Sequence, residues 1–139
     1  MKKILLSLSI VIWLALAWGC AASDPHVQKL ARGKYLIENV GMCADCHTPR
    51  TQRGELDLAR SLQGSPLSIA PTVPMPWAQA APAIAGLPSL TEAEAAKFLQ
   101  TGDLPAGRHV RPPMPPFRLS REDAEAVAAY LKTLGSKQS

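Results

Sequence analysis

The chain has 139 residues, and 15 Lys and Arg side chains against 11 Asp and Glu give it a formal net charge of +4. That length suits one domain. Lys2 and Lys3 lie in an N-terminal segment that we expect to be removed, whereas all the acidic residues follow Cys20. Loss of residues 1–19 leaves 13 basic and 11 acidic side chains, a charge of +2, so we expect no nucleic-acid partner.

The first 19 residues have the pattern of an export signal. Lys2 and Lys3 precede an apolar run over residues 4–18 that only Ser7 and Ser9 interrupt. The run has the length of the hydrophobic part of a signal peptide and is short for a membrane span. We predict a removable signal at residues 1–19 and a single domain at residues 20–139. A retained membrane anchor is the alternative.

Cys20 ends a segment that resembles a bacterial lipobox, Leu16-Ala17-Trp18-Gly19-Cys20. In a lipobox the cysteine is lipidated and becomes the first residue of the mature protein. Ala17 stands where that pattern usually has leucine, and Trp18 where it usually has a small residue. We predict lipidation of Cys20, with ordinary cleavage near Ala22 as the alternative. Either route removes a free thiol from an oxidising compartment.

Residues 25–40 are predicted to form the first helix. Asp24 can cap its N-terminus, and Pro25 suits the first helical position. The residues that share one apolar face at helical spacing are Leu30, Gly33, Ile37 and Val40. Glycine in mid-helix costs about 1 kcal/mol relative to alanine. We therefore expect Gly33 to allow close approach by another helix.

The run Cys43-Ala44-Asp45-Cys46-His47 is a CxxCH haem-attachment motif. Its two thiols lie about one helical turn apart, so they can form thioethers with the two vinyl groups of one haem. The histidine that follows is then carried under the iron as an axial ligand. A zinc site would need two more ligands, and a thioredoxin-like dithiol would need a βαβ context that is not visible. We predict one covalent haem c on Cys43, Cys46 and His47.

Prolines dominate the middle of the chain. Between Ser65 and Phe117 lie 11 of the 13 prolines, which exclude long helices there. The exception is residues 91–101, where Thr91 and Glu94 form a capping-box pattern. Residues 48–88 should therefore be a long irregular segment. Such a loop argues against a compact domain unless another group supplies core, as a haem can.

Met114 is the predicted second axial ligand. Prolines on both sides make its segment, Arg111-Pro112-Pro113-Met114-Pro115-Pro116-Phe117, a stiff arm that can hold a weakly binding thioether over a metal. A methionine that only fills the core is the alternative. Met75, also braced by prolines, and His109 compete for the position. The residues that could donate to haem propionates are Arg50, Trp77, Arg108 and Arg111.

The last predicted helix begins at Ser120 and ends at Gly135. Glu122 and Asp123 in its first turn suit the helix dipole. Its apolar stripe consists of Ala124, Val127, Ala128, Leu131 and Leu134. None of the three helical segments shows the alternation of a strand, so we predict an all-α fold with three or more helices around one haem.

With these features the chain resembles the class I c-type cytochromes, most of all the small single-haem proteins of the bacterial periplasm that serve dehydrogenase electron chains. The matching sequences are Arg32-Gly33-Lys34-Tyr35-Leu36, the CxxCH motif with Thr48-Pro49, Gly107-Arg108-His109, the Met114 segment and the last helix. The resemblance implies that the first helix crosses the last nearly at right angles, with Gly33 at the contact and Val127 or Tyr130 facing it. It also implies thioethers at Cys43 and Cys46, a proximal ligand at His47 and a distal one at Met114.

One-electron transfer without catalysis is the function that the resemblance implies. A histidine and a methionine close both axial positions and raise the reduction potential relative to two histidines. The expected partners are a dehydrogenase as donor and an oxidase or another cytochrome as acceptor, on the periplasmic side of a bacterial membrane with Cys20 as lipid anchor. The alternatives are a haem enzyme or gas sensor with an open distal site, and a subunit that acts chiefly by docking to a larger dehydrogenase.

Overall fold

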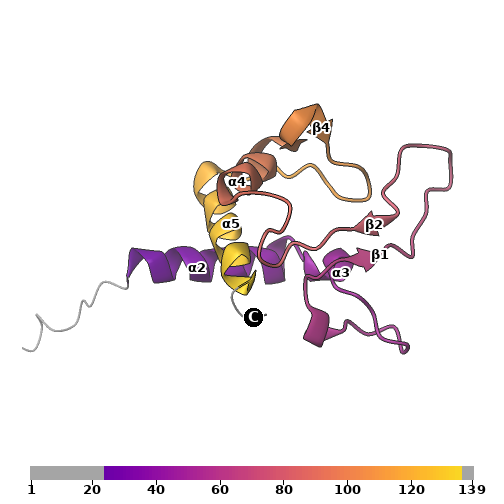
Figure 1. The fold of residues 1–139 in the computed structure, drawn as a ribbon, viewed down its shortest axis with the longest axis horizontal. Helices are drawn as coiled ribbons and strands as arrows, with labels where there is room; N and C mark the ends of the chain where they lie inside the picture. Colours follow the sequence, from indigo (N-terminus) through magenta and orange to yellow (C-terminus); the bar gives the residue numbers. More distant parts are fainter. Residues whose placement is uncertain (1–23, 136–139) are drawn as a thin grey trace, which may run out of the picture.

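The computed structural model describes residues 24–135, so the predicted signal and Cys20 lie outside the described residues. The helices are α2 (Pro25–Tyr35), α3 (Ala44–His47), α4 (Glu92–Thr101) and α5 (Arg121–Gly135) (Figure 1). Shorter turns are η1 (Leu36–Val40), which is π-helical, and the 3-10 turns η2 (Leu58–Arg60) and η3 (Pro105–Gly107). Within the described range, no helix is long and apolar enough to cross a membrane.

Two antiparallel pairs of very short strands accompany the helices. The strands are β1 (Ser65–Pro66) with β2 (Ala80–Ala81), and β3 (Asp103–Leu104) with β4 (Arg108–His109). In the first pair Ser65 lies opposite Ala81, and in the second Asp103 lies opposite His109. Each pair only closes a loop, so the prediction of an all-α fold is confirmed.

The first helix extends as predicted but changes its geometry near its end. The Asp24 side chain caps it by accepting a hydrogen bond from the His26 backbone N–H at 2.8 Å. In η1 the chain widens to i→i+5 bonding, and the Gly41 N–H donates to the Leu36 carbonyl at 2.7 Å. This extra residue in the turn shifts the buried face. Leu36 and Ile37 are buried, whereas Val40 is exposed, so the prediction that Val40 belongs to the apolar face is wrong.

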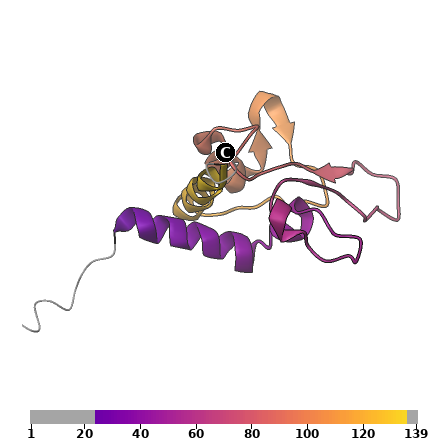
Figure 2. The same ribbon diagram turned by 60° about the horizontal axis from the view of Figure 1, so that its bottom comes forward.

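Helices α2 and α5 cross at Gly33, as Figures 1 and 2 show from two directions. A Cβ atom at Gly33 would overlap the backbone carbonyl of Ala126 and approach the Cβ of Tyr130 to 2.9 Å. The prediction that Gly33 permits this contact is confirmed. Of the two predicted facing residues, Tyr130 is among its nearest neighbours, whereas the backbone contact comes from Ala126 rather than Val127.

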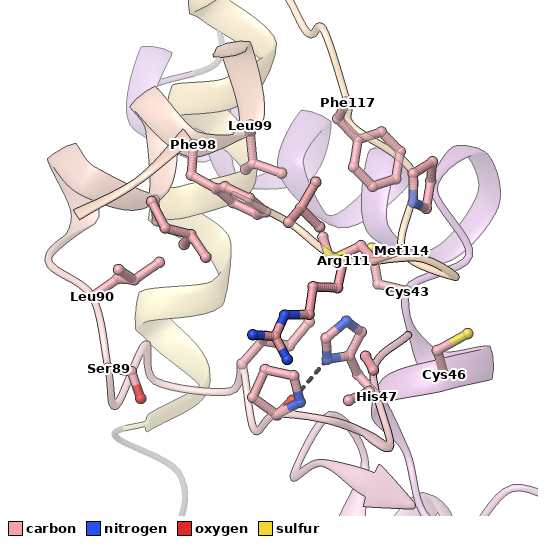
Figure 3. Close-up of a pocket in the computed structure, with 18 of the residues that line it drawn as sticks. Cys43, Cys46, His47, Ser89, Leu90, Phe98, Leu99, Arg111, Met114 and Phe117 are labelled. Atoms are coloured by element: carbon pink, nitrogen blue, oxygen red, sulfur yellow. Dashed lines mark hydrogen bonds between the residues drawn. The ribbon is translucent and has the colours of Figure 1, made fainter. Parts of the chain in front are cut away.

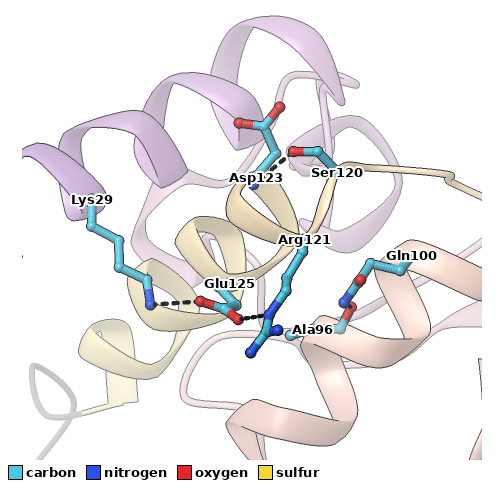
Figure 4. Close-up of polar contacts among 7 residues, drawn as sticks. All are labelled: Lys29, Ala96, Gln100, Ser120, Arg121, Asp123 and Glu125. Carbon is cyan, nitrogen blue, oxygen red and sulfur yellow. Dashed lines mark hydrogen bonds and ion pairs between the residues drawn. The ribbon is translucent and has the colours of Figure 1, made fainter.

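Ion pairs surround the crossing. Arg32 donates to both carboxylate oxygens of Asp123, at 2.8 and 3.1 Å. Glu125 pairs with Arg121 of its own helix at 2.8 Å and with Lys29 of α2 at 3.6 Å (Figure 4). These contacts lie at the surface, so each contributes little to the stability of the fold.

Helix α4 packs on α5 through small side chains. Thr91 and Glu94 form the predicted capping box, and Gly102 ends the helix in a left-handed conformation with φ 79°. The buried residues of this contact are Ala95, Ala96, Ala124, Val127, Ala128 and Leu131. The core between the helices is thus narrow and rich in alanine.

Residues 48–88 are irregular, as predicted, and backbone hydrogen bonds fix their path. The N–H groups of Ile84 and Ala85 both donate to the Leu62 carbonyl, at 2.9 and 3.1 Å. The Gly86 N–H donates to the carbonyl of Leu131 in α5 at 2.9 Å, which joins this segment to the helices. Hydrogen bonds therefore define the path of this segment, although it contains no long helix or strand.

Candidate functional site

A cavity of about 780 Å³ opens between α3, the irregular segment, α4 and the chain segment that leads to α5 (Figure 3). It brings together all four predicted haem-binding residues, Cys43, Cys46, His47 and Met114. Most of the other side chains that line it are apolar, among them Leu67, Ile84, Phe98 and Phe117. Ligand cavities of such size and lining are typical of sites that bury a large organic group.

The short helix α3 carries the attachment motif. Its turn is closed by the His47 N–H, which donates to the Cys43 carbonyl at 3.0 Å. This turn gives both Cys43 and Cys46 access to the cavity, and both thiols are free. Burial raises the pKa of the Cys43 thiol, so this group stays protonated near neutral pH.

His47 is buried and held by a single hydrogen bond. Its Nδ1 atom lies 2.7 Å from the Pro82 carbonyl oxygen (Figure 3). Because a carbonyl only accepts, Nδ1 carries the proton and donates it, which leaves Nε2 as the ring atom with a free lone pair. Burial lowers the pKa of His47, and this outweighs the opposite effect of the Pro82 bond. The imidazole is thus neutral and oriented, as a metal-binding histidine requires.

Pro82 was not anticipated from the sequence. It lies 35 residues after His47, in the irregular segment, and nothing in its sequence surroundings marks it as a partner. Two further bonds bring the segment to the motif: the Gly64 N–H donates to the His47 carbonyl at 2.8 Å, and the Leu62 N–H donates to Thr48 Oγ1 at 3.0 Å. The wall of the cavity therefore sets the orientation of the histidine.

Met114 lines the same cavity and is partly buried. Its proline-rich segment is attached on both sides. The Ala78 N–H donates to the Pro112 carbonyl at 2.8 Å, and the Leu119 N–H donates to the Leu99 carbonyl at 3.1 Å. The thioether is therefore presented by a braced segment, which is the arrangement that a weak ligand needs.

The two competitors for the distal position differ in location. Met75 is 45% exposed and does not belong to the cavity lining. His109 lines the cavity, but its side chain is 76% exposed and its Nδ1 lies 2.9 Å from an Asp103 carboxylate oxygen. The geometry favours Met114 over both.

Two of the predicted propionate donors reach the cavity. Arg108 and Arg111 line it, and Figure 3 shows the Arg111 side chain extending into it. Trp77 and Arg50 do not line it, and both donate to backbone carbonyls elsewhere, Trp77 to Ile69 at 3.0 Å and Arg50 to Gly54 at 2.8 Å. The cationic groups available to a carboxylate in the cavity are thus Arg108 and Arg111.

The donor set fits a haem c. Two free thiols stand one turn apart, a neutral histidine is oriented by a carbonyl, and a thioether and two arginines share a mostly apolar cavity. Among residues 24–135, no three or more His, Cys, Asp and Glu side chains gather as they would around a bare metal ion.

Comparison with known proteins gives two matches. A family model described as cytochrome c matches residues 30–135. A protein of Cereibacter sphaeroides described as "Diheme cytochrome c-type" is 34% identical over 113 residues, which cover 73% of this chain and 34% of that protein. The chain thus spans about a third of the length of this relative.

Proposed function

The chain belongs to the cytochrome c family, whose members bind covalent haem c, and on this premise we propose that it transfers single electrons through a haem held by His47 and Met114. Proteins of this family are generally electron carriers. When bound, the haem supplies an iron that changes between Fe(II) and Fe(III). Cys43 and Cys46 are proposed to attach it covalently.

The observation that carries the proposal is the meeting of His47 and Met114 in one cavity. Burial keeps the His47 ring neutral, and the Pro82 carbonyl orients it; such an outer hydrogen bond increases the basicity of a ligating imidazole. Met114 offers a weak thioether from a braced segment, and such a ligand would favour the reduced iron of a bound haem and raise its potential. Most of the side chains that line the cavity are apolar, so few polar groups would have to rearrange when the iron changes its charge.

The second part of the proposal concerns where in the cell the protein acts. We propose that the protein is exported to the periplasmic side of a bacterial membrane and tethered there through a lipid on Cys20. The start of α2 lies at one end of the long axis and α3, which carries cavity residues, lies away from it, so a tether before residue 24 would leave the cavity accessible (Figure 1). Tethering would raise the effective concentration of the carrier near membrane-bound partners.

We propose a dehydrogenase as electron donor and an oxidase or another cytochrome as acceptor. The related protein is described as a dihaem protein and is much longer than this chain, which makes a second haem domain one suitable class of partner. A stoichiometric complex with a dehydrogenase after gentle purification would favour a bound subunit over a free shuttle.

Carbon monoxide binding to the reduced, haem-loaded protein tests the axial ligands. We expect the absorption spectrum of the wild type and of Met75→Ala to be unchanged by carbon monoxide, because Met114 closes the iron. Met114→Ala should bind the gas, because its distal position is open. Ready binding by the wild type would overturn the proposal and support a haem enzyme or gas sensor instead.

A further inference from the structure

The loop between β1 and β2 is an apolar hairpin, which we define as residues 67–79. It belongs to a stretch from Arg60 to Glu92 that contains no charged residue between these two ends. Ile69 is 55% exposed and Val73 is 61% exposed. Neither lines the cavity, so a haem in the cavity would not cover them. Met75, in the same loop, is 45% exposed, so three large apolar side chains of one short uncharged loop face solvent, and exposed apolar surface of this kind marks interaction sites when it is contiguous.

The apolar hairpin is held in one conformation. The Leu67 N–H donates to the Gln79 carbonyl at 3.0 Å, and the indole N–H of Trp77 donates across the loop to the Ile69 carbonyl at 3.0 Å. Prolines 71, 74 and 76 restrict the backbone between these bonds. A loop already ordered loses little conformational entropy when a partner binds.

The position of the apolar hairpin relates it to electron transfer. Leu67, Pro76 and Ala78 are cavity residues, so the base of the hairpin forms part of the cavity rim. Figures 1 and 2 both show its tip at the end of the molecule opposite to the start of α2. A protein seated on the hairpin would therefore lie beside the haem cavity and away from the N-terminal attachment.

We infer that the apolar hairpin is the docking surface for a redox protein that presents an uncharged, apolar surface around its own cofactor. The uncharged hairpin requires such a partner, because a charged group buried against it would lose its hydration without gaining an opposite charge. Apolar contacts at the centre of an interface, next to both cofactors, are the part that determines affinity. This inference rests on the proposed electron-transfer function.

The test compares the wild type with the double variant Ile69→Ser/Val73→Ser, using the full, haem-loaded chain. Leu58→Ser is the matched control, because Leu58 is 75% exposed on η2 and does not line the cavity. Stopped-flow spectroscopy measures electron transfer to two oxidants. One is a small blue-copper protein with an uncharged apolar surface over its copper site, and the other is ferricyanide.

We expect the double variant to react with the copper protein roughly tenfold more slowly than the wild type, at low and at moderate salt alike. Leu58→Ser should react like the wild type, and all three proteins should reduce ferricyanide equally. An unchanged rate in the double variant, or a wild-type rate that falls steeply with salt, would overturn the docking surface. Loss of binding to neutral phosphatidylcholine vesicles by the double variant alone, with an unchanged copper-protein rate, would assign the hairpin to a membrane instead.

The two proposals fail in different ways. If the wild type cannot be reduced with dithionite and then oxidised again with ferricyanide, the electron-transfer function itself is wrong. If these reactions are normal but the double variant and the wild type reduce the copper protein at the same rate, only the docking surface is wrong.

Discussion

The helices and the irregular segments are held together by different means. Helices α2, α4 and α5 pack through glycine and alanine, with the contact between Gly33 and the Ala126 backbone at the centre. Residues 48–90 and 103–117 contribute few large buried side chains, and backbone hydrogen bonds hold them around the cavity. The hydrophobic core lies mainly between the helices, with Leu62 and Leu87 of the irregular part completing it, whereas most of the irregular part surrounds the space where the haem belongs. A substitution can therefore affect mainly the helix packing or mainly the surroundings of the haem.

Loss of both attachment cysteines should have the largest effect, and this effect should fall on the irregular part. In Cys43→Ala/Cys46→Ala the haem has no thioether, so haem staining after denaturing electrophoresis should disappear, while either single variant should retain some stain. Without the haem, the amides of Ile84 and Ala85 should exchange with solvent roughly 100-fold faster, because only hydrogen bonds within the irregular part still protect them. An equal loss of protection in α2 and α5 would contradict the distinction between the two parts.

Gly33→Ala should instead destabilise the packing of the helices. The added methyl group would overlap the Ala126 carbonyl, so α2 and α5 must separate, at a cost of roughly 3 kcal/mol in the free energy of unfolding. Urea unfolding of the haem-loaded protein measures this cost. Ala31→Ser, at an exposed position of the same helix, should change the free energy by less than about 0.5 kcal/mol. Equal stability of Gly33→Ala and wild type would show that the helices do not depend on this contact.

The smallest effect should come from the ion pair beside the crossing. Hydrogen bonding to Arg32 lowers the pKa of Asp123, so the folded state favours the ionised carboxylate. The resulting stability is present above the ordinary aspartate pKa and is lost as the pH falls through the lowered value. The difference in stability between wild type and Asp123→Asn should therefore be small at neutral pH and vanish in strong acid, and added salt should reduce it.

Glu122→Gln provides the control for that measurement, because Glu122 is exposed in the same turn of α5. The stability difference between Glu122→Gln and the wild type should not show the change with pH and salt that the Arg32 contact gives to Asp123→Asn. A difference for Asp123→Asn that persists in strong acid would mean that the side chain acts through packing and not through charge.

Features decided by neighbouring residues could be predicted from the sequence. The capping box of Thr91 and Glu94, the stop at Gly102 and the haem-attachment motif each depend on a few adjacent side chains. The ligand roles of His47 and Met114 stay predictions, although both residues meet in the cavity. Two features could not be predicted. The π-helical turn that turns Val40 outward depends on packing, and the bond from His47 to Pro82 depends on the path of 35 residues of loop.

The uncharged stretch that contains the apolar hairpin has a consequence for proteolysis. Exposed loop tips are the usual sites of nicking, yet a protease that cuts after lysine or arginine finds no such residue between Arg60 and Lys97. Complete digestion with trypsin should therefore release the hairpin, Pro82 and the start of α4 together as one peptide of residues 61–97. A single mass then reports on nearly the whole irregular wall of the cavity, including any oxidation of Met75.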